Sequence, residues 1–369
     1  MSLLGPPLHE LAIEDVERFL ADAEGEPLLW EAKGTKLNKG AVRKAIGAFA
    51  NGLETAYLIL GAEETVDGWA LSGFEFPDDP PAWVSAVVHD NLRPAPRVDV
   101  HTLAVGNGRS VAIVEVPPIA TPPCVNQGSV FERVSGRTIP VEDPMRLAEL
   151  YRRGQRARDG ALGNSVAAAE HMIGERAFRP SRARFALAVS LAGHPPDIAS
   201  RLFSHAYEES MTEIVGAQLV PRGPALPPGF APTVTPTFGQ SLRQLIIQDD
   251  HSAPSPQGWD VRVIWNGTAV IQYLTDAGTA FIDHLARGEV TEAWRAAYAL
   301  VAGLGGYGPA YMELRLDGGQ AIPAAGGGGP LQVSLGRGPL DGPAEDADFA
   351  SVERELRRAR GEAIYEEPQ

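Results

Sequence analysis

Hydrophobic positions in the first 150 residues recur at two spacings, one typical of helices and the other of strands. Spacings of three and four residues predict helices over 9–22, 38–51 and 81–92. Apolar runs and alternation predict strands over 28–33, 55–62, 98–105, 110–116, 130–134 and 138–141. Glycine-containing turns at 106–108 and 135–136 join the last two pairs of strands. The pattern predicts one α/β domain over about 150 residues.

The rest of the chain predicts a helical connector and a second α+β unit. A long helix begins near Pro144 and extends to about Ala177, with a break at 160–163. Strands are expected over 185–191, 241–248, 260–265, 268–274 and 311–316, and helices over 197–215, 289–304 and 346–364. Proline and glycine predict a long loop at 221–238 and a flexible segment at 317–345.

These elements predict the fold class α/β (α+β), with a mixed sheet in the first domain. The expected divisions are a first domain, an arginine-rich helical connector, a second α+β domain and a C-terminal helix or tail, over 1–150, 151–180, 181–340 and 341–369.

Composition places the chain among ordinary soluble globular proteins. It has 369 residues, of which 44% are hydrophobic and 21% charged. No apolar run is long enough to span a bilayer, and the N-terminus lacks the pattern of a secretory signal. The single cysteine, Cys124, excludes an internal disulfide and is expected to be a small buried apolar residue. We expect a cytoplasmic protein that does not bind membranes.

The charge is unevenly distributed. The formal net charge is −15, which argues against a protein that coats nucleic acid along its whole surface. The only lysines are Lys33, Lys36, Lys39 and Lys44, and with Arg43 they form a basic segment that contains no acid. Two interpretations stay open, a solvated helix start and a local surface that binds phosphates.

Acidic residues near this basic segment suggest a metal site. Glu26 and Glu31 are five residues apart, and Glu31 shares a strand face with Lys33 because side chains alternate along a strand. Glu63 or Glu64 follows the next apolar strand and could add a third carboxylate. Such a trio suits Mg²⁺ or Mn²⁺, whereas the alternative is a solvated acidic surface.

Other chemistry-bearing motifs are absent or misplaced. The sequence contains no phosphate-binding G-x-x-x-x-G-K-[ST], no H-E-x-x-H and no G-x-S-x-G. The glycine-rich segment 303–308 follows a predicted helix, the reverse of the order in dinucleotide-binding folds, and is interpreted as a loop.

Residues 26–150 resemble the Schlafen-type AlbA-like domain, a nucleic-acid-binding module. The resemblance rests on E-x-K at 31–33, A-F-A-N at 48–51, the apolar strand 58–64 and the segment from Phe131 to Thr138. The sequence departs from the family pattern at Ala32, where the family has Phe, and at 52–53, where a Gly-Gly is missing. No family is recognised for the C-terminal half.

The resemblance implies specific roles for residues of this chain. Glu26, Glu31 and Glu64 would hold Mg²⁺ or Mn²⁺ and, with Lys33, support cleavage of structured RNA such as tRNA. Apart from the resemblance, the basic segment and the late hairpin predict phosphate binding by Lys36, Lys39, Arg43, Lys44, Arg133 and Arg137. Family members with two such lobes form a groove, so a homodimer is expected here.

Three functional hypotheses follow. The first is a nucleic-acid-binding protein, with RNA preferred over DNA, that is a metal-dependent ribonuclease. The second is a non-catalytic nucleic-acid- or nucleotide-binding module for regulation or defence, with a C-terminal sensor or partner-binding domain. The third is an oligomerisation scaffold. Under the first hypothesis Glu31→Ala abolishes cleavage and, because Glu31 is expected to be exposed, changes stability by no more than about 0.5 kcal/mol.

Overall fold

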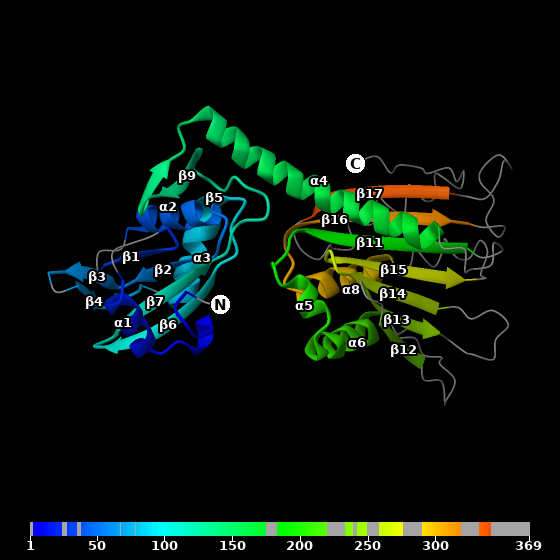
Figure 1. The fold of residues 1–369 in the computed structure, drawn as a ribbon, viewed down its shortest axis with the longest axis horizontal. Helices are drawn as coiled ribbons and strands as arrows, with labels where there is room; N and C mark the ends of the chain where they lie inside the picture. Colours follow the sequence, from blue (N-terminus) through cyan, green and yellow to red (C-terminus); the bar gives the residue numbers. More distant parts are fainter. Residues whose placement is uncertain are drawn as a thin grey trace, which may run out of the picture. The chain divides into compact units, whose positions relative to one another are not determined.

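The computed structural model describes residues 3–23, 28–34, 38–66, 68–77, 79–174, 183–219, 233–238, 242–248, 258–275, 290–318 and 332–340. The chain divides into two compact units, Met1–Arg156 and Ala157–Gln369 (Figure 1). Each unit has its own sheets and its own hydrophobic core, and the α+β class expected from the sequence is confirmed.

Unit 1 is built on a four-stranded sheet with the order β1-β2-β7-β6. Its strands are β1 (Trp30–Lys33), β2 (Ala56–Leu60), β6 (Asp99–Gly106) and β7 (Arg109–Val116). β1 runs parallel to β2, and the other pairs are antiparallel. All five residues of β2 are buried, because helices or a hairpin cover both faces of the sheet. β1 lies at one edge.

Helices α2 (Lys39–Ala50) and α3 (Pro80–Asn91) pack on one face of this sheet. Val42, Ile46 and Phe49 lie on the buried side of α2, which also packs against the strand β9 described below. The helix begins after Asn38, whose Oδ1 accepts hydrogen bonds from the N–H groups of Gly40 at 2.7 Å and Ala41 at 3.3 Å. The cap fixes where the basic segment becomes helical.

The opposite face is covered by α1 (Ile13–Ala21), by the short 3-10 helix Leu8–Glu10 and by a hairpin of β3 (Ala62–Thr65) and β4 (Gly68–Leu71). The sequence predicted one strand over 55–62, but Gly61 separates β2 from β3. Gly61 has a φ of +98°, and a Cβ there would lie 3.0 Å from the Cα of Gly73. The chain therefore turns at Gly61, and Glu63 and Glu64 belong to the separate hairpin.

A second small sheet in unit 1 has the order β10-β9-β8-β5. Its strands are β5 (Leu92–Arg93), β8 (Val125–Asn126), β9 (Ser129–Val134) and β10 (Arg137–Pro140). Ser135 and Gly136 both have positive φ, at 48° and 77°, as a two-residue hairpin turn of this hand requires. The hairpin predicted from Ser135-Gly136 is confirmed.

The long helix α4 (Pro144–Gly174) crosses the boundary between the units. The expected break at 160–163 is wrong, since the helix continues through Gly160 and Gly163. Each glycine costs a helix about 1 kcal/mol relative to alanine, and the alanines and leucine around them favour the helix. In unit 2, Ala168, Ala169 and Met172 of α4 pack against Ala186, Ala188 and Val270.

Unit 2 contains a seven-stranded antiparallel sheet with the order β12-β13-β14-β15-β11-β16-β17 (Figure 1). Its strands are β11 (Ala183–Gly193), β12 (Thr233–Phe238), β13 (Leu242–Gln248), β14 (Gly258–Ile264), β15 (Thr268–Thr275), β16 (Tyr307–Asp317) and β17 (Gln332–Leu340). Helices α5 (Ile198–Leu202), α6 (His205–Leu219) and α8 (Val290–Gly303) contribute to the core on one face, and α4 packs on the other.

Three sequence expectations in unit 2 are wrong. The helix expected over 197–215 is two helices, because the Ser204 hydroxyl accepts a hydrogen bond from the N–H of Tyr207 at 3.2 Å and caps α6. The loop expected over 221–238 contains β12, whose Pro236 is tolerated because β12 is an edge strand. The segment expected to be flexible, 317–345, contains β17. The helix expected over 346–364 lies outside the described residues.

Asn51, the last residue of A-F-A-N, fastens α2 to the second small sheet. Its Nδ2 donates to the carbonyl oxygens of Cys124 at 3.1 Å and Phe131 at 2.9 Å, and its Oδ1 accepts from the N–H of Cys124 at 2.6 Å. The Asn51 carbonyl also accepts a hydrogen bond from Arg153 at 2.6 Å. Asn51 is fully buried, so these bonds have no competition from water.

We therefore expect Asn51→Ala to lower the free energy of unfolding by about 2–4 kcal/mol, because it leaves buried backbone groups without partners. Asn91→Ala is the control, since the Asn91 Oδ1 accepts an exposed hydrogen bond from Gln127, and it should cost less than about 1 kcal/mol. Urea denaturation followed by circular dichroism measures both. Equal losses in the two variants would contradict the structural role of Asn51.

Candidate nucleic-acid interface

The carboxylate of Glu31 is the centre of a buried polar cluster in unit 1. Glu31 lies in β1 beside Leu58 of β2, so its side chain faces the same side as α2, whereas Trp30 and Ala32 face the α1 side. The Glu31 side chain is 6% exposed. A glutamate in this position requires partners, because an unpaired buried charge is costly.

Three side chains supply those partners. The Lys33 ammonium contacts Oε1 of Glu31, and the Arg133 guanidinium of β9 donates to Oε2. The Thr138 hydroxyl of β10 donates to the same Oε2 at 3.2 Å. We call Glu31, Lys33, Arg133 and Thr138 the Glu31 cluster. It confirms that Glu31 and Lys33 share a strand face.

Arg133 also attaches the β9–β10 hairpin to the edge of the main sheet. Its Nη2 donates to the carbonyl oxygen of Trp30 in β1 at 2.9 Å, and its guanidinium lies 5.3 Å from the centre of the Phe49 ring. The Arg133 side chain is only 4% exposed. Arg133, expected to bind phosphates, therefore has its charge engaged by Glu31.

The remaining predicted cations lie on α2 and β10. Lys39, Lys44 and Arg137 are exposed, and Arg43 is half-buried, with its Nη2 donating to Gln127 at 3.4 Å. The Lys44 ammonium lies 5.4 Å from the centre of the Phe131 ring. We call Lys39, Arg43, Lys44 and Arg137 the cationic surface. Lys36 lies outside the described residues.

The predicted carboxylate trio is divided among different parts of the structure. Glu26 lies outside the described residues, and Glu64 is exposed on β3 opposite Trp69. Glu63 is the glutamate beside the end of β1, since a Cβ on Gly34 would lie 2.7 Å from its Oε1. Among the described residues, no group of three or more His, Cys, Asp or Glu could hold a metal ion.

The described residues also do not fit a metal at Glu31. Both of its carboxylate oxygens contact cationic side chains, so a divalent ion there would lie beside two positive charges. The expectation that Glu31 is exposed is wrong, because the residue is 4% exposed. A substitution of Glu31 therefore affects folding as well as any activity, and loss of activity in Glu31→Ala would not by itself identify a ligand.

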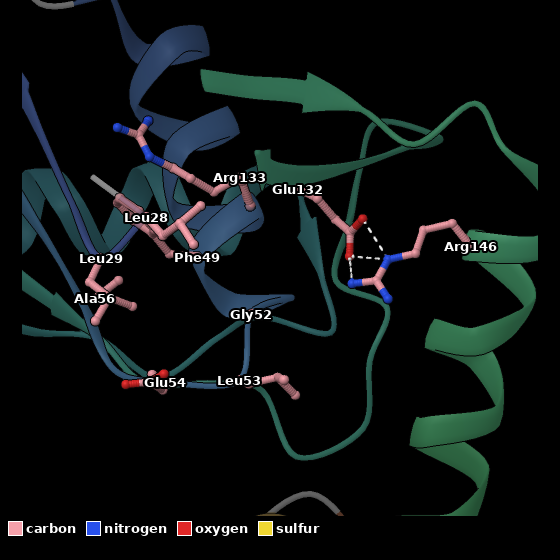
Figure 2. A pocket seen from close by; sticks show the side chains of 11 residues that line it. Leu28, Leu29, Phe49, Gly52, Leu53, Glu54, Ala56, Glu132, Arg133 and Arg146 are labelled. Carbon is pink, nitrogen blue, oxygen red and sulfur yellow. Dashed lines mark hydrogen bonds and ion pairs between the residues drawn. The ribbon is translucent and has the colours of Figure 1, made fainter. Parts of the chain in front are cut away.

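A pocket of about 250 Å³ adjoins the Glu31 cluster in unit 1 (Figure 2). Glu132 and Arg146 of α4 form a bidentate ion pair at its border, with Arg146 Nε donating to both carboxylate oxygens at 2.9 Å and Nη2 donating at 2.6 Å. This hydrogen bonding raises the pKa of Arg146. Arg133 also lines the pocket, and apolar side chains and the 52–54 loop form the rest of the lining: Leu28, Leu29, Ala48, Phe49, Gly52, Leu53, Glu54 and Ala56.

Sequence reasoning missed Thr138 as a partner of Glu31 and missed the pair of Glu132 with Arg146. A signal for Thr138 was present, since it ends the segment from Phe131 to Thr138 that resembles the family. The pair of Glu132 with Arg146 joins residues 14 positions apart across a turn and a helix start, and no regular spacing in the sequence predicts it.

Cys124 is confirmed as a buried residue. Burial raises the pKa of its thiol to about 12, so the thiolate is scarce at neutral pH. The residue packs in the core with Ala50 and Leu92 and has no features of a nucleophile.

The Glu31 cluster generates a stability prediction. Glu31→Gln keeps the shape of the side chain but removes its charge, which leaves the buried Arg133 uncompensated, and we expect a loss of about 3 kcal/mol in unfolding free energy. The control is Glu149→Gln, since the pair of Glu149 with Arg152 is 39% and 53% exposed and should contribute less than about 0.5 kcal/mol. Chemical denaturation measures both, and similar small losses would mean that the cluster contributes little.

Residues 26–142 match the family model Schlafen, AlbA_2. No curated protein matches the chain. Among solved structures, the DIP2311 protein from Corynebacterium diphtheriae is 18% identical with a TM-score of 0.26, and the alignment covers 55% of this chain and 41% of that one. No helix in the described ranges is long and apolar enough to cross a membrane. The match to the family model shows that residues 26–142 of unit 1 carry a Schlafen AlbA_2 domain.

Proposed function

We propose that unit 1 binds nucleic acid, with RNA as the ligand, through backbone phosphates at the cationic surface. The observation that carries the proposal is the exposure of Lys39, Lys44 and Arg137 on α2 and β10, two elements in contact with each other. The first turn of α2 contains no acidic residue. The Schlafen AlbA_2 match supports a nucleic-acid-binding domain, and the resemblance favours RNA over DNA.

The Glu31 cluster supports binding at this surface. Glu31 is the only acidic residue of the E-x-K motif at 31–33, and its charge is compensated by Lys33 and Arg133. It therefore does not repel a phosphate bound nearby. The net charge of −15 disfavours contact of a polyanion with the chain as a whole, so we expect phosphates to bind at a local basic surface such as this one.

Binding through phosphates has a measurable salt dependence. Each neutralised phosphate of a single strand contributes about 0.7 to the slope of log affinity against log salt concentration. We expect Lys39→Ala combined with Lys44→Ala to reduce the magnitude of that slope by about 1.4. Fluorescence anisotropy with a labelled single-stranded RNA at several salt concentrations measures the slope.

Arg97→Ala is the control for this experiment, because Arg97 is an exposed cation of unit 1 outside the cationic surface. It should leave the slope unchanged. An equal change in Arg97→Ala would indicate a general charge effect, and no binding by the unaltered protein would contradict the proposed function.

The family resemblance predicts metal-dependent ribonuclease activity, whereas the contacts of Glu31 with Lys33 and Arg133 favour binding without cleavage, and the same preparation distinguishes the two. Because the described residues do not fit a metal at Glu31, we expect structured RNA to remain intact in millimolar Mn²⁺ and to bind equally well in EDTA. Denaturing gels and anisotropy measure the two quantities. Cleavage that requires Mn²⁺ and is lost in Glu26→Ala would contradict a binding-only function and support the ribonuclease.

A further inference from the structure

The pocket beside the Glu31 cluster has the size and walls of a site for one flat ring system. Its volume of about 250 Å³ lies below the range of about 300–1,000 Å³ typical of sites for drug-sized ligands. Leu28 and Leu53 line it and are 53% and 77% exposed, so both side chains are reachable from solvent. They can therefore cover an apolar ring that enters from solvent.

The charges around the pocket argue against an anion as its ligand. Arg133 is paired with Glu31, and Arg146 is held by both carboxylate oxygens of Glu132. Glu54 adds a further negative charge to the lining. The two guanidinium groups are thus compensated, and a phosphate would find no surplus positive charge there.

The pair of Glu132 with Arg146 nevertheless offers hydrogen bonds to a neutral ligand. Arg146 uses Nε and Nη2 for Glu132, and its Nη1 makes no hydrogen bond to the described residues. Nη1 can donate, while the adjacent Glu132 oxygens retain capacity to accept. Figure 2 shows this pair at one side of the pocket, with Leu28, Leu29 and Ala56 opposite. Apolar walls with a donor and an acceptor side by side suit the edge of a nucleobase.

Strand β9 links the pocket to the cationic surface, because β9 contributes Glu132 and Arg133 to the pocket lining. Arg133 lines the pocket and lies two positions after Phe131, whose ring is beside the Lys44 ammonium. Alternate residues share a strand face, so Phe131 and Arg133 point to the same side of β9. A strand whose phosphates contact Lys44 can therefore place a base near Arg133.

We propose that this pocket receives one unstacked nucleobase of an RNA strand bound to unit 1. The proposal rests on the proposed function and deepens it, because the cationic surface would bind the backbone while the pocket holds a base. The ring would lie between Leu28 and Leu53, with its polar edge at Glu132 and Arg146.

The test uses the full chain and two single-stranded RNAs, one normal and one lacking all bases on the same backbone. Leu53→Asp removes an apolar wall from an exposed position, so the fold should be retained. We expect it to weaken binding of the normal strand about tenfold and to change binding of the abasic strand less than twofold. Anisotropy at constant salt measures both affinities.

Val66→Asp is the matched control, because Val66 is a fully exposed apolar residue of unit 1 and the change introduces the same charge. It should weaken the two strands equally and only slightly. If Leu53→Asp and Val66→Asp have the same effect, or if Leu53→Asp weakens the abasic strand as much as the normal one, the base pocket is overturned while strand binding stands.

A second measurement separates failure of the pocket from failure of the proposed function. Adenosine, guanosine, cytidine and uridine, which carry no phosphate, are tested by saturation-transfer NMR with the unaltered protein and with Leu53→Asp. A nucleoside signal lost in Leu53→Asp supports the pocket even if no RNA strand binds, and it would identify a free nucleoside or nucleotide as the ligand. If neither a strand nor a nucleoside binds, both proposals are overturned.

Discussion

The buried ion pair between Glu31 and Arg133 determines how the two sheets of unit 1 fit together. Transfer of both charges from water is costly, and the pair is stable only when further hydrogen bonds complete it. Lys33, Thr138 and the Trp30 carbonyl oxygen provide those bonds. The Trp30 carbonyl belongs to an edge strand, so Arg133 also covers part of an edge that could otherwise pair with another chain.

The same pair fixes the register of β9. Neighbouring residues on a strand point to opposite sides, so Arg133 faces Glu31 while Glu132 faces Arg146. A slip of one residue in one direction would place Glu132 opposite Glu31 and Phe131 opposite Arg146, and a slip in the other direction would place Arg133 opposite Arg146 and Val134 opposite Glu31. Each slip would break both ion pairs and bring one pair of like charges together, which is unfavourable. The order Glu132-Arg133 therefore specifies one position of the hairpin between β1 and α4.

Part of this arrangement could be predicted from the sequence, and the predictable part is local. The hairpin turn at Ser135-Gly136 and the shared face of Glu31 and Lys33 follow from φ preferences and strand alternation. The contact of Glu31 with Arg133 joins residues 102 positions apart, so no periodic pattern of the sequence predicts it. The turn at Gly61 was missed for a related reason, since the need for glycine there arises from the approach of Gly73. The same non-local packing buries Glu31, whose charge led the sequence analysis to expect an exposed residue.

The two family-like segments have a structural meaning once their contacts are known. Glu31 and Lys33 come from the E-x-K segment, and Arg133 and Thr138 come from the segment that begins at Phe131, yet all four form one cluster. Asn51 of A-F-A-N fastens α2 to Cys124 and Phe131. The residues that carry the resemblance thus hold β1, α2 and the β9–β10 hairpin together, which explains why they occur as a set without requiring catalysis. Function has to be argued from side chains that remain accessible to a ligand. In unit 1 these side chains are the exposed cations of α2 and β10 and the leucines that line the pocket. The Glu31 cluster supports the elements that carry them, but its own charges are already paired.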